Sequence, residues 1–253
     1  MKFALPTIAM SLFMAFYTMV DGLFVSNLIG TNALSAINLS APIISLVTAI
    51  STMLATALVT GITTLMFNWT MLRYVGENGI AAITIIMYVL MFVSSLFSGY
   101  SYGVAPMISY YYGEQNHEKL KKLIRKSLKI IAVISVLSLA ASLIITKPLV
   151  SIFARPDNPV FELAVTGNRI CSIALLFIGF NIFSSGMFTA LNNGIVSAIL
   201  AFSRSFVFMV ICLLALPLFF GVTGIWLATP AAELMAIALA CFMFLKYKNK
   251  YKF

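Results

Sequence analysis

The sequence contains few charged residues. Only 9% of the 253 residues are Asp, Glu, Lys or Arg, whereas 62% are hydrophobic. Soluble domains average about 25% charged residues, so this composition excludes an ordinary soluble domain. Apolar runs long enough to cross a bilayer recur along the chain. Since each span needs about 20 residues, the sequence predicts an all-α polytopic membrane protein with about seven transmembrane helices.

Cysteine and histidine are also scarce. The three cysteines (Cys171, Cys212 and Cys241) lie in apolar segments without CxxC spacing, which indicates neither a metal site nor a disulfide framework. The single histidine, His117, lies in a basic loop. No HExxH, GxGxxG, P-loop or nucleophile-elbow motif occurs in the sequence. We therefore expect no enzyme, no metal site and no cofactor other than a coupling ion.

Turn-forming residues divide the apolar sequence into segments. The predicted spans cover residues 3–27, 39–72, 79–112, 124–146, 160–190, 195–219 and 222–245. Asn, Gly, Pro and charged residues occupy the positions between them. These residue types favour turns and helix caps, so the boundaries of the spans are expected near them.

The positive charge is concentrated in two clusters, at residues 113–129 and 246–252. Both flank apolar segments, which favours contact with anionic membrane lipid over nucleic acid. An even number of predicted spans separates the clusters, so both should lie on one side of the membrane. The positive-inside rule makes that side cytoplasmic. We therefore expect a multi-pass protein of the cell membrane whose basic loop and C-terminal tail are cytoplasmic.

A short stretch occurs twice in the first third of the chain. Residues 27–37 read "NLIGTNALSAI" and residues 73–83 read "RYVGENGIAAI", with shared residues at one constant offset. Two parallel copies require an even number of spans between them. The run between them, residues 39–72, would extend about 51 Å as one helix, whereas the hydrocarbon core is about 30 Å thick. Because the run is too short for two spans, we expect a join within it.

Several stretches resemble the multidrug and toxic compound extrusion (MATE) family of transporters. The first helix, first loop and start of the second helix of that family resemble "YTMVDGLFVSNLIGTNALSAINLSAPI", and its seventh helix resembles "TTLMFNWTMLRYVGENGIAAITI". Its eighth and its tenth to twelfth helices resemble "GVAPMISYYYGEQNHEKLKKL", "GFNIFSSGMFTALNNGIVSAILAFSR" and "FFGVTGIWLATPAAE". Within the family, the resemblance is closest to the DNA-damage-inducible-protein-F-like branch.

The resemblance implies an organisation in lobes. Members of the family have twelve helices in two six-helix lobes, related by a pseudo-twofold axis along the membrane normal. The two repeated stretches would then be equivalent positions of the two lobes. An internal deletion near residues 54–61 would explain why they lie so close together. We expect residues 1–57 to be a fragment of the N-terminal lobe, and residues 58–253 to be the C-terminal six-helix lobe with its basic tail.

Asp21 is the first candidate for ion coupling. It lies in the first predicted span, with no basic residue near it in sequence. Ionisable groups inside spans are costly and mark functional sites, and apolar surroundings favour the protonated form of a carboxyl group. The resemblance implies the same role, because the matching first-helix Asp of proton-coupled members is implicated in coupling. A structural hydrogen bond to neighbouring hydroxyl groups is the alternative.

Four further residues are candidates for an intramembrane polar path. Glu233 and Arg204 lie at similar depths in the last two predicted spans, which favours an ion pair between them. A structural pair is the favoured interpretation, and a role in substrate or ion passage is the alternative. Asn181 and Ser184 lie in the core of the span at residues 160–190. Sodium-coupled members of the family have acidic residues in the corresponding helix. Asn181 and Ser184 are not acidic, so we expect a proton as the coupling ion, with sodium as the alternative.

The resemblance implies a secondary active transporter. It would export small organic cations, namely cationic amphipathic drugs or toxic metabolites, by antiport with a coupling cation. Alternating access needs two lobes, so we expect a homodimer in which a second copy replaces the missing lobe. Two alternatives stay open: a truncated relative that does not transport, and a flippase of lipid-linked saccharides. Flippases tend to line their cavity with basic residues, and the embedded basic residues here are mainly Arg204 and Arg169, which favours drug export.

Overall fold

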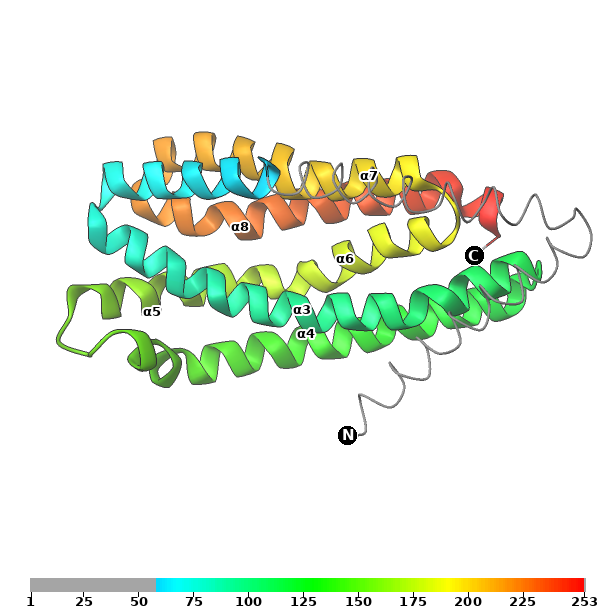
Figure 1. Cartoon of the computed structure of the whole chain (residues 1–253), viewed down its shortest axis with the longest axis horizontal. Coiled ribbons are helices and arrows are strands. Elements are labelled where there is room, and N and C mark those ends of the chain that lie inside the picture. The colour runs from blue at the N-terminus through cyan, green and yellow to red at the C-terminus, as the bar shows by residue number, and fades with distance from the viewer. Residues whose placement is uncertain (1–57, 253) are drawn as a thin grey trace, which may run out of the picture. The chain divides into compact units, whose positions relative to one another are not determined.

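The computed structural model describes residues 58–252. The chain divides into two units, Met1–Leu58 and Val59–Phe253, and the second is described here. Asp21 and the first copy of the repeated stretch lie outside the described residues. The helices are residues 58–74, α3 (Glu77–Gly113), α4 (His117–Phe153), α5 (Pro159–Cys171), η1 (Ser172–Ala174), α6 (Leu175–Ala190), α7 (Gly194–Phe202), η2 (Ser203–Val207) and α8 (Phe208–Tyr251) (Figure 1).

Within residues 58–252, four continuous helical stretches are long and apolar enough to cross a membrane. They are Glu77–Gly113, His117–Phe153, Pro159–Ala190 and Gly194–Tyr251. The last consists of two rods, because Gly221 has non-helical backbone angles (φ 56°, ψ −131°). The chain reverses there, which brings Cys212 Sγ to 3.8 Å from Met235 Sδ. Together with residues 58–74, these rods form an all-α lobe of six helices, and the predicted fold class is confirmed.

Asparagine side chains fix the starts of three helices at predicted turns. The side-chain oxygens of Asn116, Asn158 and Asn193 accept hydrogen bonds from first-turn backbone N–H groups of α4, α5 and α7, at 3.1, 2.9 and 3.3 Å. Such caps satisfy donors that have no partner within the helix. Gly76, just before α3, has φ 84°, a left-handed conformation that favours glycine. The turn residues read from the sequence therefore act as caps and turns.

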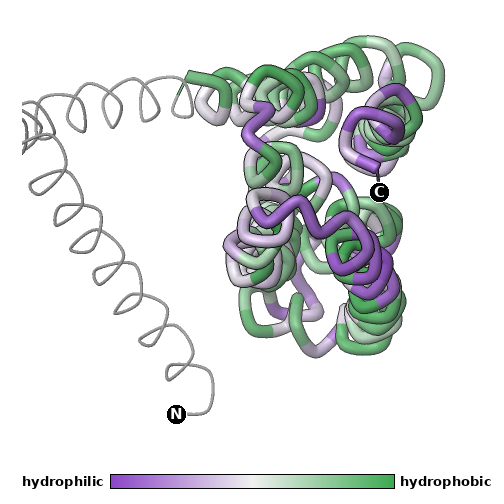
Figure 2. The backbone as a smooth tube through the Cα atoms, turned by 90° about the vertical axis from the view of Figure 1, so that its right-hand side faces the viewer, coloured by the Kyte–Doolittle hydropathy of each residue, from purple (hydrophilic) through white to green (hydrophobic). Residues whose placement is uncertain are grey.

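The basic loop and the basic tail lie at the same end of the lobe. The rings of Tyr112, at the end of α3, and Tyr251, at the end of α8, have centroids 5.5 Å apart. Asn193, in the turn between α6 and α7, donates a hydrogen bond to the Tyr251 hydroxyl at 3.0 Å. Figure 2 views this end, where the turns and the C-terminal residues are hydrophilic. Both clusters therefore lie at one end of the lobe, which agrees with the prediction that they share one side of the membrane.

Two apolar clusters form the core of the lobe. One surrounds Phe67 and Trp226, and the other surrounds Phe97 and Phe188; all four side chains are almost completely buried. Glu233 is also buried, between α8 residues that belong to the two clusters. The polar groups described below therefore lie where the two apolar clusters meet.

Gly179 on α6 allows three helices to meet closely. A Cβ atom at this position would lie 2.5 Å from the ring of Phe97 on α3 and 2.9 Å from Ile131 on α4.

We predict that Gly179→Ala lowers the free energy of unfolding by about 1–3 kcal/mol, because the added methyl group overpacks this contact. Thermal unfolding of the detergent-solubilised full chain measures the effect. Gly103→Ala on α3 is the control, since nothing lies within 4 Å of its Cβ; equal stability of the two variants would contradict the prediction.

Candidate functional site

Arg204 on η2 and Glu233 on α8 form an ion pair inside the lobe. Arg204 Nε donates to Glu233 Oε1 at 2.8 Å and to Oε2 at 3.0 Å. The Glu233 side chain is 6% exposed and that of Arg204 is 22% exposed. The ion pair that the sequence favours is therefore present. It joins two residues that lie on either side of the chain reversal at Gly221.

Asn181 on α6 completes the shell around the carboxylate. Its Nδ2 donates to Glu233 Oε2 at 2.7 Å and to the Glu233 backbone carbonyl at 2.9 Å. Both carboxylate oxygens thus have donors, as a charge buried among apolar helices requires. Asn181 Oδ1 is buried and has no hydrogen-bond partner among residues 58–252. The three side chains tie α6, η2 and α8 together at one depth.

Arg204 lies in a π-helical turn. In η2 the Phe208 backbone N–H bonds to the carbonyl of Ser203, five residues earlier, so one extra residue is inserted into the helix. Such turns rotate the following residues relative to an α-helix and often occur at functional sites. No glycine or proline lies within η2. The local sequence therefore gives no signal for this irregularity.

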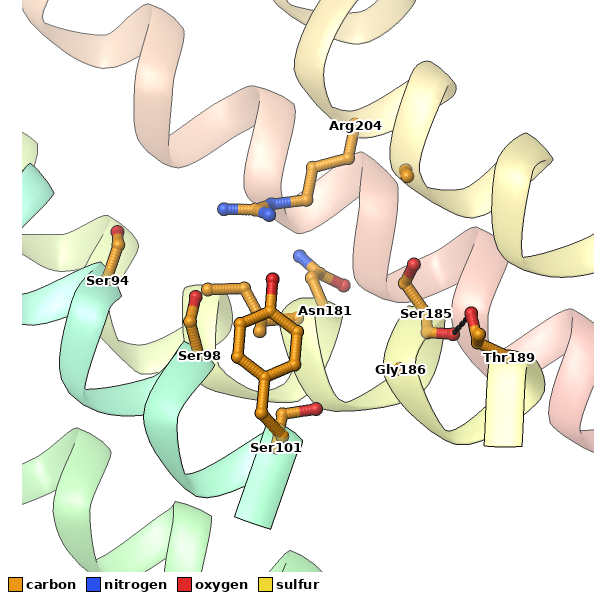
Figure 3. A pocket seen from close by; sticks show the side chains of 11 residues that line it. Ser94, Ser98, Ser101, Asn181, Ser185, Gly186, Thr189 and Arg204 are labelled. Atoms are coloured by element: carbon orange, nitrogen blue, oxygen red, sulfur yellow. Dashed lines mark hydrogen bonds between the residues drawn. The ribbon is translucent and has the colours of Figure 1, made fainter. Parts of the chain in front are cut away.

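A polar cavity of about 410 Å³ lies beside the ion pair. We call it the serine cavity, and α3, α6, α7 and η2 supply its walls (Figure 3). It is lined by Ser94, Ser98, Ser101, Tyr102, Asn181, Ile182, Ser185, Gly186, Thr189, Ala201 and Arg204. Hydroxyl groups predominate, and Arg204 is the only charged residue in this lining.

A second cavity, of about 420 Å³, also adjoins the pair. We call it the threonine cavity, because Thr60, Thr63, Thr64 and Thr229 lie in its wall together with Glu233. Ser94 and Arg204 line both cavities. The ion pair therefore adjoins two cavities whose walls carry hydroxyl groups. These hydroxyl groups were not predicted from the sequence, although Ser94, Ser98 and Ser101 have the spacing of one helix face.

Ser184 does not line either cavity. It is buried, and its hydroxyl donates to the Phe180 carbonyl at 2.6 Å. The neighbouring Ser185 lines the serine cavity, and its Oγ lies 3.1 Å from Ser197 Oγ on α7. Ser197 Oγ also lies 2.7 Å from Thr189 Oγ1. The polar face of α6 thus continues from Asn181 through residues 185 and 189, and the structure does not bring Ser184 to it.

The remaining candidates lie away from these cavities or outside the described residues. Arg169 is exposed and lines neither cavity, and Asp21 lies outside the described residues. Within residues 58–252, no group of three or more His, Cys, Asp or Glu side chains is placed to hold a metal ion. The described site is a neutralised ion pair beside two cavities that carry hydroxyl groups, an arrangement suited to binding polar groups within a membrane.

Comparisons with known proteins agree with this architecture. The MatE family model matches residues 62–214, more than half of the chain. The chain is 27% identical over 190 residues to the multidrug export protein MepA of Staphylococcus haemolyticus (strain JCSC1435). That alignment covers 75% of this chain but 41% of MepA. The chain therefore spans less than half the length of this relative.

Solved structures share the fold of the lobe. One is a multidrug resistance MATE family transporter of the MOP superfamily in an outward-facing conformation, with a TM-score of 0.71 and 21% identity over 77% of this chain and 44% of that chain. Another is a MOP superfamily transporter from Pyrococcus furiosus, with a TM-score of 0.71 and 20% identity over 78% of this chain and 44% of that chain. With the family match, these findings show that the chain belongs to the MATE family of membrane transporters.

Proposed function

We propose that this chain is a MATE-type secondary active transporter of the cell membrane. It exports cationic amphipathic drugs or toxic metabolites by antiport, driven by inward movement of protons. The observation that carries this proposal is the buried Arg204–Glu233 pair, which adjoins two cavities in a lobe of MATE fold. Charged groups inside membranes are rare and mark the paths of substrates and ions.

The coupling carboxylate is Asp21. Within the described residues, Glu233 is the only acidic side chain that lines the two cavities, and Arg204 and Asn181 already satisfy it. The other described acidic residues lie at helix ends or in turns; they are Glu77, Glu114, Glu118, Asp157 and Glu162. A proton-carrying group inside the membrane, or a counter-charge for a cationic substrate, must therefore come from elsewhere in the chain. Sodium is the alternative coupling ion.

The end of the lobe that carries the basic loop and tail faces the cytoplasm. The positive-inside rule supports this orientation, because residues 119–129 and 246–252 supply most of the positive charge and lie at one end. Lys119 and Lys250 also lie over the rings of Tyr111 and Tyr251. Aromatic and basic side chains of this kind anchor helices at the lipid headgroups.

Two copies of the chain form the transporting unit. The chain covers 44% of the solved MATE transporter and 41% of MepA, so one copy supplies about one lobe. The same coverage supports the alternative of a shortened relative that does not transport. A flippase of lipid-linked saccharides receives less support, since Arg204 is the only basic residue in the lining of the two cavities.

Replacement of Asp21 tests the coupling role. We predict that Asp21→Asn reduces ethidium export from efflux-deficient cells at least about tenfold, because an amide cannot carry the coupling proton. Export is measured at matched membrane levels of each protein. Asp157→Asn is the control, since Asp157 is exposed in a turn. Export by the Asp21→Asn variant at the unmodified rate would contradict the role, and no export by the unmodified chain would favour the non-transporting alternative.

The oligomeric state of the purified chain tests whether two copies form the transporting unit. We predict that the detergent-solubilised full chain has twice the mass of one chain by multi-angle light scattering, because one lobe offers no partner for alternating access. The same preparation is reconstituted into liposomes and assayed for transport. A monomeric preparation that transports would contradict the prediction.

The ion pair is predicted to be structural. We expect Glu233→Gln and Arg204→Gln each to lower the free energy of unfolding by about 3–5 kcal/mol, because each leaves an unpaired charge in the lobe. The double variant should recover most of the loss, since both charges are removed. Chemical unfolding in detergent measures the cycle. The exposed pair of Lys122 and Glu118 is the control, and its double-glutamine variant should change stability little. Additive losses at Arg204 and Glu233 would contradict a coupled pair.

A further inference from the structure

We propose that the serine cavity binds organic carboxylates through the terminal amino groups of Arg204. The inference rests on the proposed function, because it names a substrate class for the same site. It differs from the cationic class that the sequence favours. Its basis is the part of Arg204 that Glu233 leaves unused.

The guanidinium group of Arg204 has two sides with different surroundings. Its Nε faces Glu233 and makes both hydrogen bonds to that carboxylate. Its terminal nitrogens, Nη1 and Nη2, donate to no protein acceptor within residues 58–252. Figure 3 shows this end of the side chain directed into the cavity, between Ser94 on α3 and Asn181 on α6. Such a fork of N–H donors matches the two oxygens of a carboxylate.

Neutral polar groups beside Arg204 complete a site for an acid. Among the described residues, the hydroxyl groups of Ser94 and Ser98 have no protein partner, so both can donate to a carboxylate oxygen. Asn181 also lines the cavity, but its unpartnered Oδ1 is itself buried, so it adds no acceptor for the ligand in this structure. The cavity therefore offers donors to the charged group.

Charge and size favour an organic anion. No acidic side chain lines the serine cavity, whereas Arg204 does, so the neutral pair turns its positive end toward the cavity, and this end favours anions over cations. The volume of about 410 Å³ is far larger than an inorganic ion needs and lies in the range of small-molecule pockets. Ile182 and Ala201 offer apolar surface to the body of such a ligand.

Three naphthalene compounds of similar shape test the preference for a carboxylate. They are naphthalene-2-carboxylate, the uncharged naphthalene-2-carboxamide and the cationic 2-naphthylmethylammonium. Each is titrated into the purified full chain in detergent, its fluorescence is followed, and protein-free micelles are the blank. We expect the carboxylate to bind at least about tenfold more tightly than the other two, as a charged hydrogen-bonded pair implies. Equal or tighter binding of the carboxamide or the ammonium compound would overturn the proposal.

Matched variants assign the binding to this cavity. Arg204→Gln combined with Glu233→Gln removes both charges together, so it avoids an unpaired buried carboxylate, and it should abolish the preference for the carboxylate. Ser98→Ala should weaken carboxylate binding. Ser95→Ala, on the exposed side of α3, should leave it unchanged. An undiminished preference in a folded double variant would overturn the assignment.

The titration needs no ion gradient, so its outcome is separate from that of the export assay. Tight binding of the carboxylate without export of any compound would overturn the proposed function alone. Export of ethidium together with equal binding of the three naphthalene compounds would overturn the carboxylate site alone.

Discussion

A carboxylate buried among apolar helices must be paired, and this requirement organises the lobe around Glu233. The hydrogen-bond donors to its carboxylate are Arg204 on η2 and Asn181 on α6, which are distant from Glu233 along the chain. Satisfying the charge therefore fixes the depth of three rods relative to one another. The apolar clusters on either side contribute packing, but nonpolar contacts are less directional than hydrogen bonds. The ion pair therefore specifies how the helices align, and the clusters pack around that alignment.

The pairing also determines the chemistry that this lobe can supply. Because Arg204 neutralises Glu233 and Asn181 donates a hydrogen bond to it, the lobe presents hydroxyl groups and the outer face of a guanidinium, not a free acid. The proposed transporter would thus separate its tasks: Asp21 would couple the ion, and the described lobe would bind polar groups of the substrate. The π-helical turn at η2 contributes to this arrangement, since it sets the direction from which Arg204 reaches Glu233.

Much of this lobe follows from the sequence. Apolar length and turn residues predict the span at 79–112 to within two residues of α3 (Glu77–Gly113), and similar depth predicts the pair of Arg204 with Glu233. The span at 124–146 was too short, because α4 (His117–Phe153) extends seven residues further at each end, through the basic segment before it and past Pro148 after it. The serine cavity could not be predicted, because it depends on which faces of α3 and α6 meet. Neighbouring serines illustrate the limit: Ser184 bonds to its own helix, whereas Ser185 faces the cavity. A rotation of about 100° per residue separates them, and composition alone does not fix that angle.

Symmetry explains why a single lobe could serve as half of a transporter. The lobes of this family are parallel repeats, related by an axis along the membrane normal. A second copy related by a twofold axis of the same direction keeps its basic loop and tail on the same side of the membrane. Both copies then obey the positive-inside rule, and each contributes one neutral Arg204–Glu233 pair. Inverted repeats would force one copy into the opposite orientation. The proposed homodimer therefore needs no reversal of topology, only a face of the lobe that can pack against its own copy.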